Sequence, residues 1–189
     1  MKRFLKLSKR TVTLIAVTLG SSIAILDGSI VNLALPAIAK DLNVPFSVLQ
    51  WIADAYLSAL ILLGGSLGDI FGRKRVYLVG VAGFGISSIL CAIAPNAEIL
   101  IAARVLQGIF GALMVPGALA IINTNFPKSE RGRAIGHWTA WSSIAVVAAP
   151  FLAGAILATG GWRWIFLVNI PLSALCFAIA AASTRESSD

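Results

Sequence analysis

The feature that most constrains the fold of this chain is a series of long apolar segments with short polar stretches between them. A transmembrane helix needs about 20 consecutive, mostly apolar residues. Segments of that size follow one another at 11–35, 48–68, 76–94, 99–123, 135–159 and 165–182. The sequence therefore predicts an all-α membrane protein whose six transmembrane helices form one bundle.

The overall composition supports this interpretation. Charged residues make up 12% of the chain, whereas they make up about 25% of a soluble domain. We expect a basic stretch at 1–10, a six-helix bundle at 11–182 and a short tail at 183–189. The first apolar segment resembles a secretory signal, but it continues past Asp27 without a small-residue cleavage site, so we interpret it as a retained helix.

The basic residues are distributed unevenly. In a six-span arrangement Lys40 and Arg163 lie on one side, Arg104 lies within a span, and all other Lys and Arg residues fall on the opposite side. Short loops rich in Lys and Arg remain cytoplasmic, so both termini are expected in the cytoplasm. No nucleic-acid partner is expected despite the net charge of +7, because the bases alternate with apolar spans and form no single stripe.

Three ionisable residues fall inside the apolar segments, namely Asp27, Asp54 and Arg104. A charge in hydrocarbon costs at least about 2.5 kcal/mol on insertion scales, so such a residue usually faces a cavity or a partner. Each of the three is therefore a candidate for transport. Asp54 lies nearer the predicted outer surface, where interfacial solvation is an equal alternative.

Asp27 has two interpretations that do not exclude each other. Burial among apolar helices favours the uncharged form of a carboxyl group, which makes Asp27 a candidate proton carrier. Alternatively, Asp27 pairs with Arg104 and holds two helices together. Gln107, three residues after Arg104, extends a polar face along the same side of that helix. The alternative for Arg104 is that its long side chain reaches the outer interface.

A short charged turn at 65–75 separates the second and third apolar segments. It contains Asp69, followed by the adjacent bases Arg73, Lys74 and Arg75. Gly72 permits backbone conformations that are closed to residues with a Cβ atom. A hairpin between two membrane helices is the simplest structure that fits.

Enzyme signatures are not found in the sequence. It contains no Gly-x-x-x-x-Gly-Lys-Ser/Thr phosphate loop and no Cys-x-x-Cys pair. His137 is the only histidine and has no second ligand at metal spacing, so no metal site is expected. We expect neither enzymatic activity nor a cofactor.

Three motifs together resemble the major facilitator superfamily, and within it the fourteen-helix drug:proton antiporter branch. The turn matches that family's motif between helices two and three at Gly65, Asp69, Gly72, Arg73 and Lys74, with Ile70 where a base is usual. The first segment is similar to the branch's signature at Asp27, Asn32 and Pro36. The fourth segment resembles the family's fourth-helix motif at Arg104, Gln107, Gly108, Gly111 and Ala112.

The fifth segment resembles the antiporter motif of the family less closely. Pro150 and Gly154 remain, and alanine stands at the other glycine positions. The resemblance implies a helix kink at Pro150 and Gly154, proton coupling through Asp27, Arg104, Gln107 and Asn32, and a conformational switch at the charged turn. Asp54 joins the proton-coupling candidates because it lies inside an apolar segment.

The resemblance also implies a function and partners. The expected function is proton-coupled efflux of drugs or small metabolites, with hydrophobic or cationic substrates, through the lipid bilayer of a bacterial cytoplasmic (inner) membrane. Transporters of this family use two six-helix bundles. We therefore expect a second bundle as a partner, either a missing C-terminal half or another copy. The alternative is a truncated, transport-inactive fragment or a membrane interaction partner.

Overall fold

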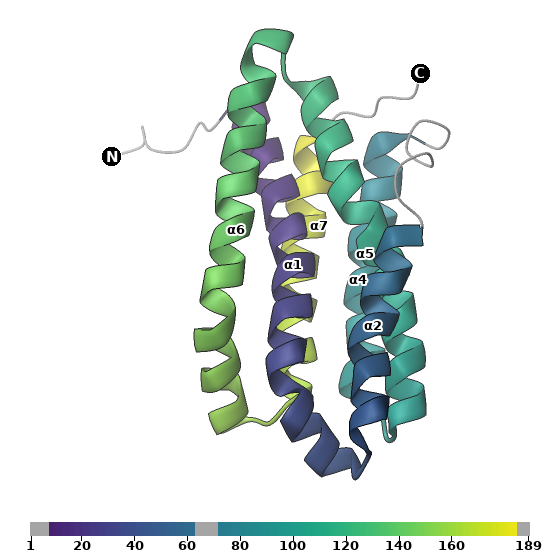
Figure 1. Cartoon of the computed structure of the whole chain (residues 1–189). Coiled ribbons are helices and arrows are strands. Elements are labelled where there is room, and N and C mark those ends of the chain that lie inside the picture. The colour runs from purple at the N-terminus through teal and green to yellow at the C-terminus, as the bar shows by residue number, and fades with distance from the viewer. Residues whose placement is uncertain (1–7, 63–71, 185–189) are drawn as a thin grey trace.

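The computed structural model describes residues 8–62 and 72–184, apart from the side chains of 46 and 56–62. Every regular element within these ranges is an α-helix. The helices, in chain order, are α1 (Lys9–Leu42), α2 (Phe46–Leu62), α4 (Arg73–Ala92), α5 (Ala97–Asn125), α6 (Lys128–Thr159) and α7 (Arg163–Ser183). They run alternately up and down as one bundle (Figure 1).

Five of the helices, all except α2, are long and apolar enough to cross a membrane. The described part of α2 has 17 residues and stops where the described residues stop. The expected all-α membrane architecture is therefore confirmed, and five of the six expected spans meet the length and composition of a transmembrane helix.

Two predicted loops are wrong in their extent. We expected the first helix to end at Pro36, but α1 continues to Leu42, where Asn43 takes the left-handed conformation (φ 51°) and donates its N–H to the Ala39 carbonyl. A proline inside a helix removes its own N–H donor and crowds the carbonyl four residues earlier, which can kink a helix without ending it, and Pro36 lies inside α1. The stretch between the expected segments 99–123 and 135–159 is shorter in the structure, because α5 continues to Asn125 and α6 begins at Lys128, directly after Pro127.

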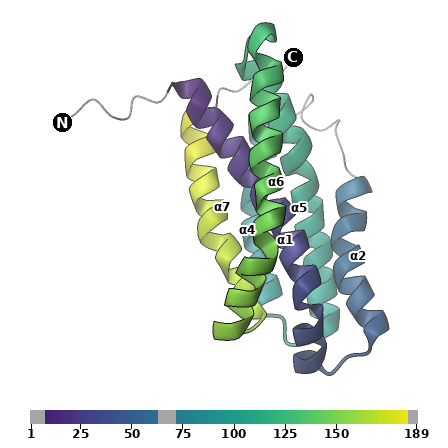
Figure 2. The ribbon, with the colours of Figure 1, turned by 60° about the vertical axis from the view of Figure 1, so that its left-hand side comes forward.

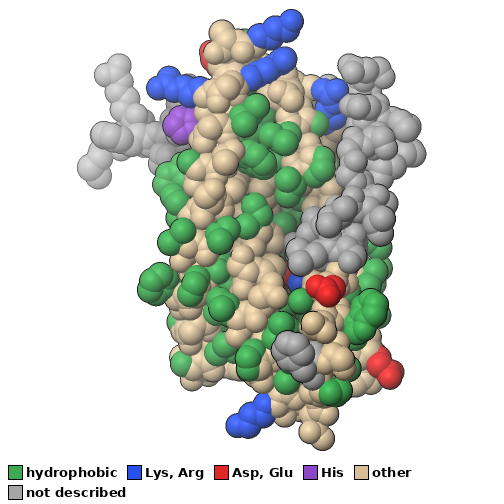
Figure 3. Space-filling model, viewed as in Figure 1, with side chains coloured by type: hydrophobic (Ala, Val, Ile, Leu, Met, Phe, Trp, Pro, Cys, Tyr) green, Lys and Arg blue, Asp and Glu red, His purple; other side chains and the backbone are tan. Residues whose placement is uncertain are grey.

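Bases gather at one end of the bundle. We call this the basic end; it is formed by the N-termini of α1, α4 and α6 and the C-termini of α5 and α7. Figure 3 shows most of the visible Lys and Arg side chains there, above a flank covered by hydrophobic side chains. Lys40 and Arg163 lie at the opposite end, as the sequence predicts. Which end faces the cytoplasm remains a prediction.

The opposite end is held together by one ion pair and its neighbours. Asp41 at the end of α1 accepts hydrogen bonds from Arg163 Nη1 (2.6 Å) and from the indole N–H of Trp162 (2.9 Å). Arg163 also donates to the carbonyl of Ala94, which follows α4, at 3.2 Å. These contacts connect α1, α4 and α7 where they leave the apolar part of the bundle.

Packing inside the bundle centres on α1, α4 and α5. Helix α1 contacts α5, α6 and α7, and α4 lies against both α5 and α7, whereas α6 contacts mainly α1 along one side of the bundle (Figure 2). Glycines allow α4 and α5 to approach closely. A Cβ added at Gly83 would overlap the ring of Phe110, and one added at Gly80 would lie 3.0 Å from the Phe110 carbonyl oxygen.

We predict that Gly80→Leu destabilises the protein. The new side chain must push α5 away from α4, and overpacking of this kind costs about 1–3 kcal/mol. Thermal unfolding in mild detergent measures the change. Gly136→Leu is the matched control, because an added Cβ at Gly136 in α6 meets no atom within 4 Å. Equal melting temperatures for the two variants would contradict the close approach of α4 and α5.

Candidate functional site

The interior of the bundle contains an ion pair between Asp27 of α1 and Arg104 of α5. Arg104 Nη1 lies 2.5 Å from Asp27 Oδ2, and the two side chains are 1% (Arg104) and 0% (Asp27) exposed. Burying a charge without a partner is costly, and a direct charge-assisted hydrogen bond offsets part of that cost. The structure therefore contains the ion pair between Asp27 and Arg104 that the sequence offered as one interpretation of Asp27.

Two amide side chains complete the surroundings of the carboxylate. Asp27 Oδ1 accepts hydrogen bonds from Asn169 Nδ2 of α7 at 2.6 Å and from Gln107 Nε2 of α5 at 3.3 Å. Gln107 also accepts from Arg104 Nη1 at 2.7 Å and donates to Ser88 Oγ of α4 at 2.8 Å. We call these residues, Asp27, Ser88, Arg104, Gln107 and Asn169, the polar cluster.

Arg104 reaches two further helices. Its Nε donates to the carbonyl oxygen of Ile52 in α2 at 3.3 Å. Its guanidinium carbon lies 5.8 Å from the centroid of the Phe166 ring of α7, which is within the range of a cation–π contact. The guanidinium is thus surrounded by α1, α2, α5 and α7, and it does not extend to the outer interface.

The polar cluster lies between two apolar clusters. In α1, Asp27 falls between Ala24, which belongs to one cluster, and Ile30, which belongs to the other. In α7, Asn169 likewise falls between Phe166 and Cys176. The low dielectric of such a layer strengthens each polar interaction, and it also raises the cost of any group left unpaired.

Two predicted proton-coupling residues lie outside this cluster. Asp54 of α2 and Asn32 of α1 are both exposed. The Asn32 side chain donates to the carbonyl of Gly28 in its own helix at 2.8 Å. Asp27, Arg104 and Gln107 are brought together by the fold, whereas Asp54 and Asn32 are not part of that arrangement.

The charged turn is described only at its end. Gly65 and Asp69 lie outside the described residues. Gly72 has a φ of 92°, the left-handed region for which glycine was expected. Arg73 and Lys74 open α4, and Lys74 Nζ donates to the Ala181 carbonyl near the end of α7 at 2.7 Å.

The predicted kink residues lie in the most exposed helix. Pro150 is inside α6, and both Pro150 and Gly154 are exposed. An added Cβ at Gly154 would meet no atom within 4 Å. These residues therefore make no close helix contact within the described part of the chain.

Ser88 and Asn169 were not predicted as site residues. The cost of placing a charge in hydrocarbon points to ionisable residues, and a hydroxyl or an amide carries no charge. Asn169 could have been found by asking which helices hold an amide within an apolar run, because its segment is otherwise almost wholly apolar. Ser88 gives no such signal, since a helical serine can bond its own backbone; Ser88 Oγ also donates to the Phe84 carbonyl at 2.8 Å.

We predict that the ion pair behaves as a coupled unit in stability measurements. Arg104→Met leaves the Asp27 carboxylate buried without a cation, and the free energy of unfolding should fall by about 3 kcal/mol. The double variant Asp27→Asn/Arg104→Met should regain more than half of that loss. A double-mutant cycle of thermal unfolding in detergent measures the coupling.

The exposed pair of Asp41 and Arg163 is the matched control for this cycle. Its side chains are 48% (Asp41) and 39% (Arg163) exposed, so Asp41→Asn and Arg163→Met should couple by about 1 kcal/mol or less. Similar coupling energies for the buried and the exposed pair would contradict the role given to burial.

Comparison with known proteins places this arrangement in a large family. The sequence model of the Major Facilitator Superfamily matches residues 17–188. The chain is 43% identical over 166 residues to a protein of Streptomyces coelicolor named "Probable actinorhodin transporter", covering 84% of this chain and 29% of that protein. It is 40% identical over 179 residues to "Multidrug resistance protein Stp" of Mycobacterium tuberculosis, covering 93% of this chain and 33% of that protein.

Another relative is "Puromycin resistance protein pur8" of Streptomyces alboniger, 42% identical over 167 residues, with 86% of this chain and 33% of that protein covered. The chain thus spans about a third of the length of these curated relatives. Among solved structures, a bacterial homologue of the human lysosomal transporter Spinster has the same fold. It superimposes with a TM-score of 0.77 at 22% identity, covering 96% of this chain and 45% of the other.

Proposed function

Because the chain belongs to the major facilitator superfamily, we propose that it is the N-terminal bundle of a transporter that exports drugs or small metabolites in exchange for protons. The observation that carries this proposal is the polar cluster, in which one carboxylate and one guanidinium are fully buried together. Ionisable groups inside a membrane protein commonly belong to ion or proton pathways. The names of the relatives favour antibiotic-like substrates.

In the proposed mechanism Asp27 carries the proton. Protonation removes the negative charge that faces Arg104. The guanidinium then still has Gln107 Oε1 at 2.7 Å and the Ile52 carbonyl at 3.3 Å as acceptors. The attraction between α1 and α5 weakens, and the balance between two arrangements of the helices shifts. Release of the proton restores the ion pair and the first arrangement.

The charged turn at 65–75 acts in this proposal as the conformational switch. The contact between Lys74 and the Ala181 carbonyl connects its described end to the last turn of α7. Movement of α7, whose Asn169 donates to Asp27, is thereby linked to the position of the turn. The proposal also sets the orientation in the membrane: the basic end faces the cytoplasm, and both termini lie on the cytoplasmic side.

A second six-helix bundle is part of the proposal. Helix α6 has few buried residues, and its exposed hydrophobic side chains include Trp141, Val147 and Phe151. Such a surface fits another bundle or lipid tails. If no second bundle is present, the alternative function is that of an inactive fragment or an interaction partner, because one bundle offers only one wall to a substrate.

We predict that Asp27→Asn abolishes proton-driven efflux while the protein remains in the membrane. The amide keeps the size of the side chain but can neither bind nor release a proton. Everted vesicles from a pump-deficient bacterium expressing the chain measure the proton-dependent uptake of a cationic dye. Glu98→Gln is the matched control, because Glu98 is an exposed carboxylate in the first turn of α5.

Unchanged proton-driven transport in the Asp27→Asn variant would contradict the proposal that Asp27 carries the proton. Absence of transport by the unaltered chain, together with a monomeric size in mild detergent, would instead favour the inactive fragment. Transport accompanied by a dimeric size would identify a second copy as the missing bundle.

A further inference from the structure

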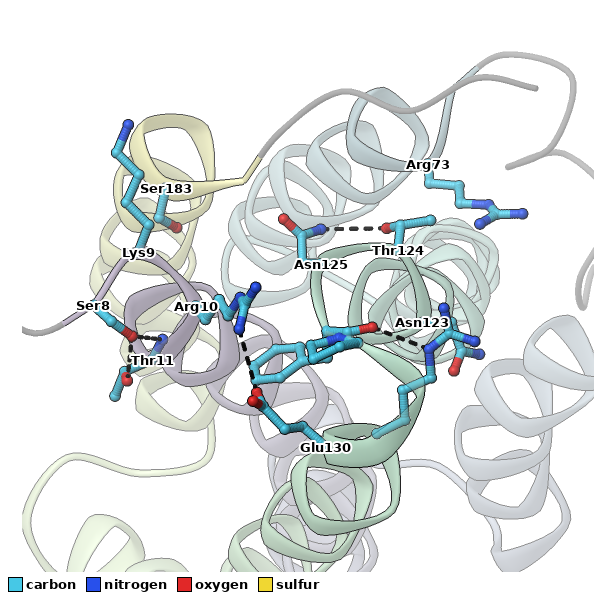
Figure 4. A pocket seen from close by; sticks show the side chains of 13 residues that line it. Ser8, Lys9, Arg10, Thr11, Arg73, Asn123, Thr124, Asn125, Glu130 and Ser183 are labelled. Carbon is cyan, nitrogen blue, oxygen red and sulfur yellow. Dashed lines mark hydrogen bonds and ion pairs between the residues drawn. The ribbon is translucent and has the colours of Figure 1, made fainter.

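A polar pocket of about 1350 Å³ lies at the basic end of the bundle. It is bordered by the first turn of α1, the start of α4, the α5–α6 connection and the end of α7. Figure 4 shows the side chains of Lys9, Arg10 and Arg73 around it, together with the hydroxyl and amide groups of Thr124 and Asn125. None of these residues belongs to the polar cluster.

The charge of the pocket lining favours an anion. Among the described residues that border it, four are basic, Lys9, Arg10, Arg73 and Arg131, and one is acidic, Glu130. Glu130 is paired with Arg10 at 3.4 Å, and Arg73 makes an interaction of its own, so Lys9 and Arg131 are the two bases that we assign to an anion. Arg131 is half-buried, and its Nε donates to the carbonyl of Phe126 at 3.1 Å, which fixes the direction of the guanidinium.

Helix ends add to this preference. The N-termini of α1, α4 and α6 lie at this end of the bundle, and each carries a partial positive charge. Pro127 caps α6 without a side-chain hydrogen bond to its first turn. The Asn123 amide adds a neutral group that can donate hydrogen bonds to phosphate oxygens. The Asn125 amide already donates to the Ile121 carbonyl and to Thr124 Oγ1, and the Ser8 and Thr11 hydroxyls are bonded to each other.

The position of the pocket points to a lipid more than to a dissolved anion. Phospholipid phosphates lie at the level where the apolar part of a transmembrane helix ends, and the tails extend along the helix. The pocket is bordered by the ends of α1, α4, α5 and α7, where the apolar spans of these helices end. Basic pockets between transmembrane helices on the cytoplasmic side bind anionic headgroups.

We propose that this pocket binds the phosphate headgroup of an anionic phospholipid. Lys9 and Arg131 contact the phosphate oxygens from α1 and α6, and the Asn123 amide donates a further hydrogen bond to them. The proposal rests on the orientation proposed above, with the basic end in the cytoplasm, and is independent of transport and of the proton role of Asp27.

The test measures lipid retained by the whole chain. The unaltered protein is reconstituted in mixed vesicles of phosphatidylcholine and phosphatidylglycerol, extracted in mild detergent and examined by native mass spectrometry. We expect preferential retention of phosphatidylglycerol. The double variant Lys9→Gln/Arg131→Gln should reduce that retention by about tenfold, because each base near a lipid surface contributes several-fold to binding.

The control removes the same charge at the same end. Lys128 and Arg133 are exposed residues of α6 that do not border the pocket, so Lys128→Gln/Arg133→Gln should retain phosphatidylglycerol nearly as well as the unaltered chain. A second pocket variant, Lys9→Gln/Arg10→Gln, leaves the Arg131 contact with Phe126 intact and covers the case in which the first variant fails to fold.

Three outcomes would overturn the proposal. Equal losses in the pocket and control variants would mean that phosphatidylglycerol follows the general surface charge. Equal retention of phosphatidylcholine and phosphatidylglycerol would mean that the pocket does not select an anion. Pocket-dependent binding of inorganic phosphate in detergent, without pocket-dependent retention of lipid, would assign the site to a dissolved anion.

Discussion

The rest of the structure depends on the cost of holding Asp27 and Arg104 away from water. Both side chains are almost completely buried, so every oxygen and N–H of the pair needs a partner from the protein. The partners come from side chains of α5 and α7 and from a carbonyl of α2, and Ser88 of α4 in turn accepts from Gln107. Each of these helices must therefore present a particular face to the centre, which fixes its rotation about its own axis.

Close packing makes these contacts possible. Serine and asparagine have short side chains, and Ser88 reaches Gln107 at 2.8 Å only because α4 lies directly against α5. Gly80 and Gly83 allow that approach. The apolar clusters on either side exclude water, which strengthens the hydrogen bonds of the layer between them. Small residues and polar residues thus have complementary roles in one bundle.

The two ends of the bundle handle charge in a different way from the centre. The Asp41–Arg163 pair is solvated and connects α1 to α7, whereas the basic end collects several cations around an open polar pocket. Charges at the ends cost little because water and headgroups solvate them, so their number can be large. In the centre, where that solvation is missing, a single pair requires partners from several helices.

The sequence by itself determined that the chain is a membrane protein, where its helices lie approximately, that its bases fall mostly on one side, and which family it resembles. These properties depend on the length of apolar segments, on charge and on local motifs, all of which can be recognised in consecutive residues. It also singled out Asp27, Arg104 and Gln107. Only the tertiary structure decided that these residues meet, that Ser88 and Asn169 join them, and that Asp54 and Asn32 do not. The reason is physical: the meeting of side chains up to 142 positions apart depends on helix rotation and packing, which no local pattern encodes.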